Sequence, residues 1–230
     1  MKNNISIAID GPVGSGKGTL AVALAKKINA LYVYTGAMYR ELALACSREK
    51  IDVTNEEQIL NIFNKISIRL EPKEKGIRAF LDNEDVSDKI FQPNISNLTP
   101  VVAAFPKVRE AMVLKQKKLI LDAALSGRSV VMEGRDISTK VMPDADLKIY
   151  LTASIETRAR RRLKQFEGNK VKVDFEQVLL DLKERDRMDM ERKASPLSVA
   201  PDAYVLDTTD LSVEETVNKV VEKLKEKRLL

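Results

Sequence analysis

The sequence predicts an α/β protein whose core is a doubly wound, five-stranded parallel sheet. One observation supports this fold class, and a second indicates how the chain is divided. Short apolar runs alternate with helical patterns at both ends of the chain, and a central segment breaks the alternation. Such alternation is typical of parallel strands joined by crossover helices. We therefore expect a core domain made of residues 1–36 and 107–230, with residues 37–106 inserted as a separate lobe.

Two strand–helix pairs are predicted at the start of the chain. Residues 5–9 form an apolar run typical of a buried strand, and residues 16–29 carry a helical pattern with one apolar face. Residues 31–34 are predicted as the second strand and residues 39–48 as the second helix.

The central segment is predicted to be helical and antiparallel. Thr54 and Glu57 have the spacing of a capping box, which predicts a helix that runs to Lys65. Residues 67–70 and 78–81 are predicted as the two arms of a hairpin. Three prolines punctuate the stretch that follows, where we expect further helix.

The second half of the chain returns to the alternation of helices and strands. We expect helices at about residues 107–126, 154–166, 174–190 and 212–229, and strands at residues 129–132, 147–151 and 204–207. Ser212 and Glu215 form a second predicted capping box. With the two N-terminal strands, these segments give the five strands of the core.

The composition excludes several kinds of chemistry. The 230 residues include 39 Lys and Arg, 34 Asp and Glu, no His and one Cys, for a formal net charge of +5. Without histidine there is no Ser-His-Asp or Cys-His catalysis and no imidazole metal site. The single cysteine, Cys46, excludes an intrachain disulfide and favours a reducing, cytoplasmic compartment. No apolar run approaches the ~18 residues of a membrane span, so we expect no membrane partner.

The strongest motif is a glycine-rich turn between the first strand and the first helix. It matches G-x-x-x-x-G-K and comprises Gly11, Pro12, Val13, Gly14, Ser15, Gly16, Lys17, Gly18 and Thr19. Glycines let backbone amides point at phosphate oxygens, and the start of the helix adds its positive end. Lys17 can reach the outer phosphates of a nucleotide. The alternative, a turn that binds nothing, is disfavoured by three glycines and a lysine at fixed spacing, so the motif predicts nucleotide binding.

Four segments together resemble the bacterial cytidylate kinases, which are nucleoside monophosphate kinases. They are the glycine-rich loop, residues 35–40 (TGAMYR), residues 133–136 (EGRD), and residues 183–189 (KERDRMD) followed by Arg192. The resemblance extends from about residue 5 to the last helix. It implies a P-loop kinase in which ATP binds the loop, the inserted lobe binds the nucleoside monophosphate, and residues 157–172 form a lid.

The acceptor site is predicted from the chain and from this resemblance. Thr35 and Arg40 follow the second strand, at the rim where open α/β sheets bind ligands, and a guanidinium grips phosphate well. The alternative for such residues is a helix cap and an exposed charge. By resemblance, the residues that bind CMP are Thr35, Arg40, Thr99, Arg109, Arg135, Asp136, Arg185, Asp189 and Arg192.

The roles implied within this set differ. Arg109 and Asp136 are implied to contact the cytosine base, with Thr99 in support. Arg185 and Asp189 are implied to contact the ribose. The sequence departs from the family at two positions: Pro100 stands where the family has a serine, and Tyr34 stands where an acidic residue often precedes the Thr or Ser.

An arginine-rich helix is the predicted border of the lid. Arg158, Arg161 and Arg162 share one face at the spacing i, i+3, i+4, and like charges placed so closely repel one another unless an anion binds. The alternatives are a solvated face and an RNA-binding patch. Mg²⁺ is expected with ATP. Its candidate ligands are Thr19, Asp10 and Glu133, partly through water.

The predicted reaction is in-line transfer of the γ-phosphoryl group of ATP to CMP or dCMP. Lys17, Arg135, Arg158 and Arg162 are the predicted catalytic residues. A phosphate with a second pKa of ~6 is already largely dianionic at pH 7, so no general base is needed. The alternatives are a P-loop kinase with another acceptor, such as UMP or AMP, and a P-loop switch ATPase associated with nucleic acid. We expect a monomer that acts on small nucleotides and has no nucleic-acid partner.

Overall fold

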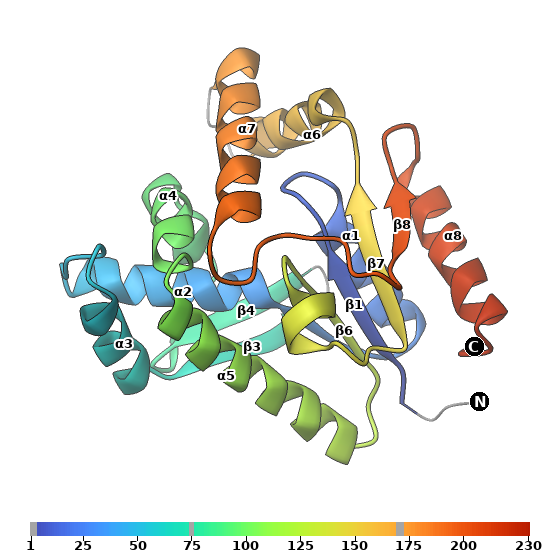
Figure 1. Cartoon of the computed structure of the whole chain (residues 1–230), viewed down its shortest axis with the longest axis horizontal. Coiled ribbons are helices and arrows are strands. Elements are labelled where there is room, and N and C mark those ends of the chain that lie inside the picture. The colour runs from blue at the N-terminus through green and yellow to red at the C-terminus, as the bar shows by residue number, and fades with distance from the viewer. Residues whose placement is uncertain (1–3, 74–75, 169–172) are drawn as a thin grey trace.

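The computed structural model describes residues 4–73, 76–168 and 173–230, and its core is a five-stranded parallel sheet. The spatial order of the strands is β2-β6-β1-β7-β8, and β1, β7 and β8 can be followed side by side in Figure 1. The strands are β1 (Ser6–Asp10), β2 (Leu31–Tyr34), β6 (Val130–Gly134), β7 (Leu147–Thr152) and β8 (Tyr204–Asp207). All neighbouring pairs are parallel. The predicted fold class is confirmed.

Helices cover both faces of this sheet. Ile7 and Ile9 of β1 pack with α1 (Lys17–Lys27) and α8 (Val213–Glu226) in one hydrophobic cluster. Ala8, whose side chain points to the opposite face, packs in a second cluster with Ala123 of α5 (Pro106–Leu125). This alternation along a strand that is buried on both faces is what a doubly wound sheet requires.

The central segment forms a lobe around α2 (Thr35–Arg48). The other elements of this segment are α3 (Glu56–Lys65), β3 (Ile68–Lys73), β4 (Gly76–Leu81), β5 (Glu84–Asp85), the 3₁₀ turn η1 (Lys89–Phe91) and α4 (Pro93–Val102). The predicted hairpin is present as β3 and β4, and the short strand β5, which was not predicted, extends it. Met112 in the first half of α5 also packs into this cluster, so α5 contacts both the lobe and the sheet.

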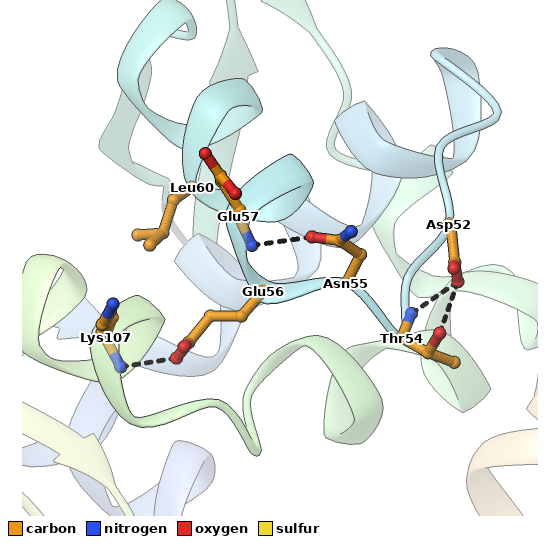
Figure 2. Close-up of a pocket in the computed structure, with 7 residues that line it drawn as sticks. All are labelled: Asp52, Thr54, Asn55, Glu56, Glu57, Leu60 and Lys107. Carbon is orange, nitrogen blue, oxygen red and sulfur yellow. Dashed lines mark hydrogen bonds between the residues drawn. The ribbon is translucent and has the colours of Figure 1, made fainter.

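Two helix starts differ from the sequence prediction. Helix α2 begins at Thr35, directly after β2, and not at residue 39. Helix α3 is capped by Asn55, whose Oδ1 accepts hydrogen bonds from the amides of Glu57 (3.0 Å) and Gln58 (3.1 Å). Thr54, the predicted cap, instead donates from its amide and its hydroxyl to Asp52 Oδ1 (Figure 2). The second capping box, at the start of α8, is confirmed.

A small surface pocket at the start of α3 is a structural junction. The carboxylate of Glu56 accepts a hydrogen bond of 2.8 Å from the backbone amide of Lys107, in the first turn of α5 (Figure 2). Because Glu56 lies in the first turn of α3, its carboxylate also complements the positive end of α3. The pocket therefore joins α3 to α5, and its polar groups bond mainly to one another.

The remaining helices stand over the carboxyl ends of the strands. Helices α6 (Ile155–Gly168) and α7 (Phe175–Glu191) pack against each other above β7 (Figure 1). The predicted lid, residues 157–172, covers α6 from residue 157 onward, and its residues 169–172 lie outside the described part of the chain. No helix among the described residues is long and apolar enough to cross a membrane.

Candidate active site

A cleft of about 1120 Å³ lies along the carboxyl ends of the strands, between the sheet, the inserted lobe and the helices α6 and α7. Residues from all of these elements line it. Its basic side chains are Lys17, Lys26, Arg40, Arg109, Arg135, Arg161, Arg162, Lys164, Arg185 and Arg192, and its acidic ones are Glu133, Asp136 and Asp189. A cleft with ten cations and three anions favours a ligand that carries several negative charges.

The glycine-rich loop has the conformation that an anion site needs. Helix α1 begins at Lys17 after Gly16, which has φ +95°, and no side chain caps its first turn. The first amides of the helix are therefore available to an anion. At the start of the loop, Gly11 has φ +148°, and a Cβ there would lie 2.0 Å from the carbonyl oxygen of Leu151. Only glycine fits this close approach of loop and strand.

Lys17 is held over this loop. Its ammonium group donates a hydrogen bond of 2.7 Å to the carbonyl of Pro12, and the side chain is buried. Burial lowers the pKa of Lys17, the nearby cation Arg135 lowers it further, and the carboxylate of Glu133 acts in the opposite direction. A phosphate bound in the loop would favour the charged ammonium.

The three candidate metal ligands are placed differently. Thr19 and Glu133 line the cleft. Glu133 also accepts a hydrogen bond of 2.5 Å from the Tyr32 hydroxyl, and burial raises its pKa. Asp10 is fully buried and does not line the cleft. Its carboxylate accepts from the amides of Ile137 (2.9 Å) and Ser138 (2.7 Å), so it anchors the turn that follows β6.

Residues predicted to contact the acceptor base meet at the end of the cleft that borders the lobe. Arg109 and Asp136 form an ion pair of 2.6 Å. Arg109 also donates to the carbonyl of Ala103 at 3.0 Å. Thr99 lines the cleft from α4, and its hydroxyl donates to the carbonyl of Ile95 at 2.6 Å. Pro100 lies inside α4, one residue beyond Thr99.

Asp189 is surrounded by three arginines. Its carboxylate lies 2.7 Å from Arg135 Nε, 3.6 Å from Arg185 Nε and 3.5 Å from a terminal nitrogen of Arg192. Burial acts to raise the pKa of Asp189, but Arg135 and Arg185 outweigh it and hold this pKa below its usual value. All four side chains line the cleft. The arrangement fixes the directions of three guanidinium groups before a ligand arrives.

Arg40 connects the cleft to the lobe. One of its terminal nitrogens donates to the carbonyl of Ile90 (2.9 Å) and to the hydroxyl of Ser96 (2.8 Å). Its guanidinium lies over the ring of Phe91, 5.1 Å from the ring centroid. Thr35, at the start of the same helix, donates to the carbonyl of Glu133 at 2.7 Å. Thr35 thereby ties the start of α2 to the end of β6.

The structure does not bring Arg158 into the cleft. Its guanidinium forms an ion pair of 2.7 Å with Asp186 on α7 and donates to the carbonyls of Val13 (3.2 Å) and Ala153 (3.1 Å). Arg162, one turn further along α6, does line the cleft. All nine residues predicted to bind CMP line it as well.

Arg161 and Thr208 were not among the predicted site residues, yet both line the cleft. Arg161 donates to the hydroxyl (2.9 Å) and the carbonyl (2.6 Å) of Thr208. Thr208 directly follows β8, at the same rim as the other strand ends. Its position directly after a predicted core strand could have identified Thr208 as a site residue.

The chain is similar along nearly its whole length to known proteins of one family. The model of the cytidylate kinase family matches residues 7–226. A cytidylate kinase of Caldanaerobacter subterraneus subsp. tengcongensis is 46% identical over 221 residues, which cover 96% of this chain and 95% of that protein. A cytidylate kinase of Bacillus thuringiensis is 43% identical, with 96% of each chain covered.

A solved structure shares the fold. An uncharacterized protein from Eubacterium ventriosum superposes with a TM-score of 0.54 at 14% identity, covering 96% of this chain and 99% of that one. At this level of identity the likeness concerns the fold alone.

Proposed function

This chain belongs to the cytidylate kinase family, and from that premise we propose that its cleft transfers the γ-phosphoryl group of ATP to CMP or dCMP. The observation that carries the proposal is that one cleft joins two sites. The phosphate loop with Lys17 lines one part of it, and the Arg109–Asp136 ion pair lines another. A phosphoryl transfer between two nucleotides needs both to be held in one cavity.

The charges in the cleft support direct transfer without a general base. The acceptor phosphate, with a second pKa of ~6, is already largely dianionic at pH 7. Lys17, Arg135 and Arg162 supply positive charge around the reacting phosphates and align them. For Arg158 we propose a positioning role, since it links the phosphate loop at Val13 to Asp186 on α7.

The residues present fit Mg²⁺ that is bound chiefly through ATP. Among the described residues, no group of three acidic, histidine or cysteine side chains could hold a metal ion. Mg²⁺ commonly keeps several waters and binds through substrate phosphates plus one or two protein groups. Thr19 and Glu133 line the cleft and would hold it, directly or through water. The ion would supply positive charge to the phosphates of ATP.

We also propose that the lobe of residues 37–106 carries the acceptor part of the site and that the protein acts as a cytoplasmic monomer on free nucleotides. Support for the lobe comes from Thr99 and Phe91, which line the cleft from α4 and η1. Support for a reducing compartment comes from Cys46, which is free and buried.

The experiment is an ADP-release assay with ATP, Mg²⁺ and a panel of acceptors. CMP, dCMP, UMP and AMP are compared with a reaction that lacks an acceptor. We expect ADP release that depends on CMP or dCMP and is slow in their absence. Release that is equal in all reactions would indicate a switch ATPase, and release greatest with UMP or AMP would assign a different acceptor.

A further inference from the structure

Tyr34 lines the cleft, although neither the motifs nor the predicted roles include it. It is the last residue of β2 and pairs in register with Glu133 of β6. Its ring lies across Gly36, where a Cβ would be 2.5 Å from Tyr34 Cε2 and 2.9 Å from its hydroxyl oxygen. The glycine at position 36 therefore leaves the space that this ring fills.

The ring of Tyr34 also faces the inserted lobe. It stacks against the ring of Phe91 in η1, with centroids 6.3 Å apart and planes 8° from parallel. Stacking at this separation is an ordinary aromatic contact. Arg40 lies over the ring of Phe91. The stack fixes the plane of the Tyr34 ring and hence the direction in which its hydroxyl points.

Three arginines from different elements line the cleft together with Tyr34. Tyr34 contributes to the electrostatic environment of Arg135 after β6, Arg162 on α6 and Arg185 on α7. Burial lowers the pKa values of Arg162 and Arg185, and Arg40 lowers both further. These cations repel one another and gain from a bound anion. Among the described residues, none forms a hydrogen bond with the Tyr34 hydroxyl.

We propose that the Tyr34 hydroxyl donates a hydrogen bond to a phosphate oxygen of a nucleotide bound in this cleft, which makes Tyr34 a substrate-contacting residue. The proposal rests on the proposed function, because it takes the anion to be a nucleotide phosphate. A phenol suits this position better than a carboxylate, since it donates a hydrogen bond and adds no negative charge near the phosphate. The phosphate belongs either to the acceptor or to the γ position of ATP, and the two are distinguished by experiment.

Tyr34→Phe is the test, because it removes the hydroxyl and keeps the stacked ring. A hydrogen bond to a charged group contributes about 1.5–3 kcal/mol, so we expect kcat/KM to fall by about tenfold or more. If the Tyr34 hydroxyl contacts the acceptor phosphate, kcat/KM for CMP falls and CMP binds the variant more weakly. If the γ-phosphate is contacted, the loss appears in kcat or in the KM for ATP.

The matched control is Tyr204→Phe, the same chemical change in β8 at a residue that does not line the cleft. Both variants should unfold at the urea concentration of the wild type. Calorimetric binding of CMP, ATP and cytidine is measured alongside turnover. Cytidine lacks a phosphate, so its binding should be the same for Tyr34→Phe and the wild type.

The outcomes separate the two proposals. If the wild type releases no ADP with any nucleoside monophosphate, the proposed function fails, and the binding measurements still test Tyr34. If the wild type is active while Tyr34→Phe matches it in kcat, in both KM values and in the binding of both nucleotides, the role of Tyr34 is overturned. An equal weakening of cytidine and CMP binding would also overturn it, because the effect would then not involve phosphate.

Discussion

Arg109 and Asp136 form an ion pair of 2.6 Å in which the two side chains are only 3% and 5% exposed. The pair spans two elements, because Arg109 lies in the first turns of α5 and Asp136 follows β6. A buried pair is costly to break, since removing one partner leaves the other charge buried without compensation. The pair therefore fixes the position of α5 relative to the sheet as well as the directions of the two side chains in the cleft.

Asp136→Asn should destabilise the protein by about 3 kcal/mol or more, because Arg109 keeps its charge in a buried site. It should also reduce CMP-dependent ADP release. Urea unfolding and the kinetic assay measure the two effects. The control is Glu84→Gln, which breaks the exposed ion pairs of Glu84 with Arg48 and Lys89 and should leave the urea midpoint nearly unchanged. Equal effects of the two substitutions would contradict the structural role of the buried pair.

Strand positions in the core could be predicted from the sequence with little error. β2 and β8 have the predicted bounds, and β1 is displaced by one residue. Strands buried on both faces are short continuous apolar runs, which are easy to recognise between a glycine-rich turn and a helical pattern. The start of α2 was predicted four residues too late because the helix follows β2 without a loop, so no turn residue marks its start. The cap of α3 was misplaced because Asn55 and Thr54 are both good cap formers.

Side-chain directions in the site could be predicted only in part. Arg158 and Arg162 share one face of α6 by periodicity, and periodicity cannot tell which of them reaches the cleft. Arg158 is held away from the cleft because it forms an ion pair with Asp186 on α7. That contact depends on the packing of two helices, which no local pattern encodes. The stack of Tyr34 on Phe91 was unpredictable for the same reason, because it joins the sheet to the inserted lobe.

Lys17→Met should abolish phosphoryl transfer while the protein stays folded. Methionine has a similar length without the charge, and the Lys17 side chain is buried, so the apolar replacement should not lower the free energy of unfolding. Turnover should fall by at least about 100-fold, the scale seen when one preorganised charge-stabilising group is lost. ADP release with CMP and urea unfolding are the measurements. Turnover at the wild-type rate would rule out a catalytic role for Lys17.

Arg162→Met and Arg158→Met should have opposite consequences. Arg162 lines the cleft, so its loss should lower kcat and leave the urea midpoint unchanged. Arg158 pairs with Asp186 away from the cleft, and its loss should destabilise the protein by about 3 kcal/mol, since Asp186 is left without its partner. Unfolding curves and kinetics on both variants provide the comparison. If Arg158→Met lowered kcat more than it lowered the free energy of unfolding, Arg158 would have to be assigned a catalytic role.

Gly11→Ala should destabilise the protein by about 3 kcal/mol or more. The added Cβ would lie 2.0 Å from the carbonyl oxygen of Leu151, and φ at this position is +148°, so close contact and an unfavourable backbone conformation combine. The control is Gly168→Ala at the end of α6, where a Cβ would meet no atom of the described residues within 4 Å. This second substitution should stabilise the helix by about 0.5 kcal/mol. Comparable unfolding midpoints for the two variants would contradict the close packing of the loop against β7.

Stability should fall as the pH rises from the pKa of Glu41 in the unfolded chain to its pKa in the folded protein. Burial raises the pKa of Glu41 in the folded protein to about 8, and Lys115 on α5 acts in the opposite direction. An unfolded glutamate has a pKa of about 4.3. Between these values the folded protein binds a proton that the unfolded chain has released, so the free energy of unfolding decreases with pH and levels off above pH 8.

Glu41→Gln should remove this slope, because glutamine stays neutral at every pH. The wild type and the variant are unfolded in urea at pH 5, 7 and 9. Between pH 5 and pH 9, the free energy of unfolding of the variant should rise relative to that of the wild type by up to about 4 kcal/mol. Glu84→Gln provides a control whose stability should run parallel to that of the wild type over this pH range. The side chains of Arg48 and Lys89 hold the pKa of Glu84 at about 2, so its stabilising effect is present above the unfolded pKa and is lost only as the pH falls toward 2. Parallel curves for the wild type and Glu41→Gln would mean that Glu41 ionises normally, and the buried carboxyl would then need a partner that compensates its charge.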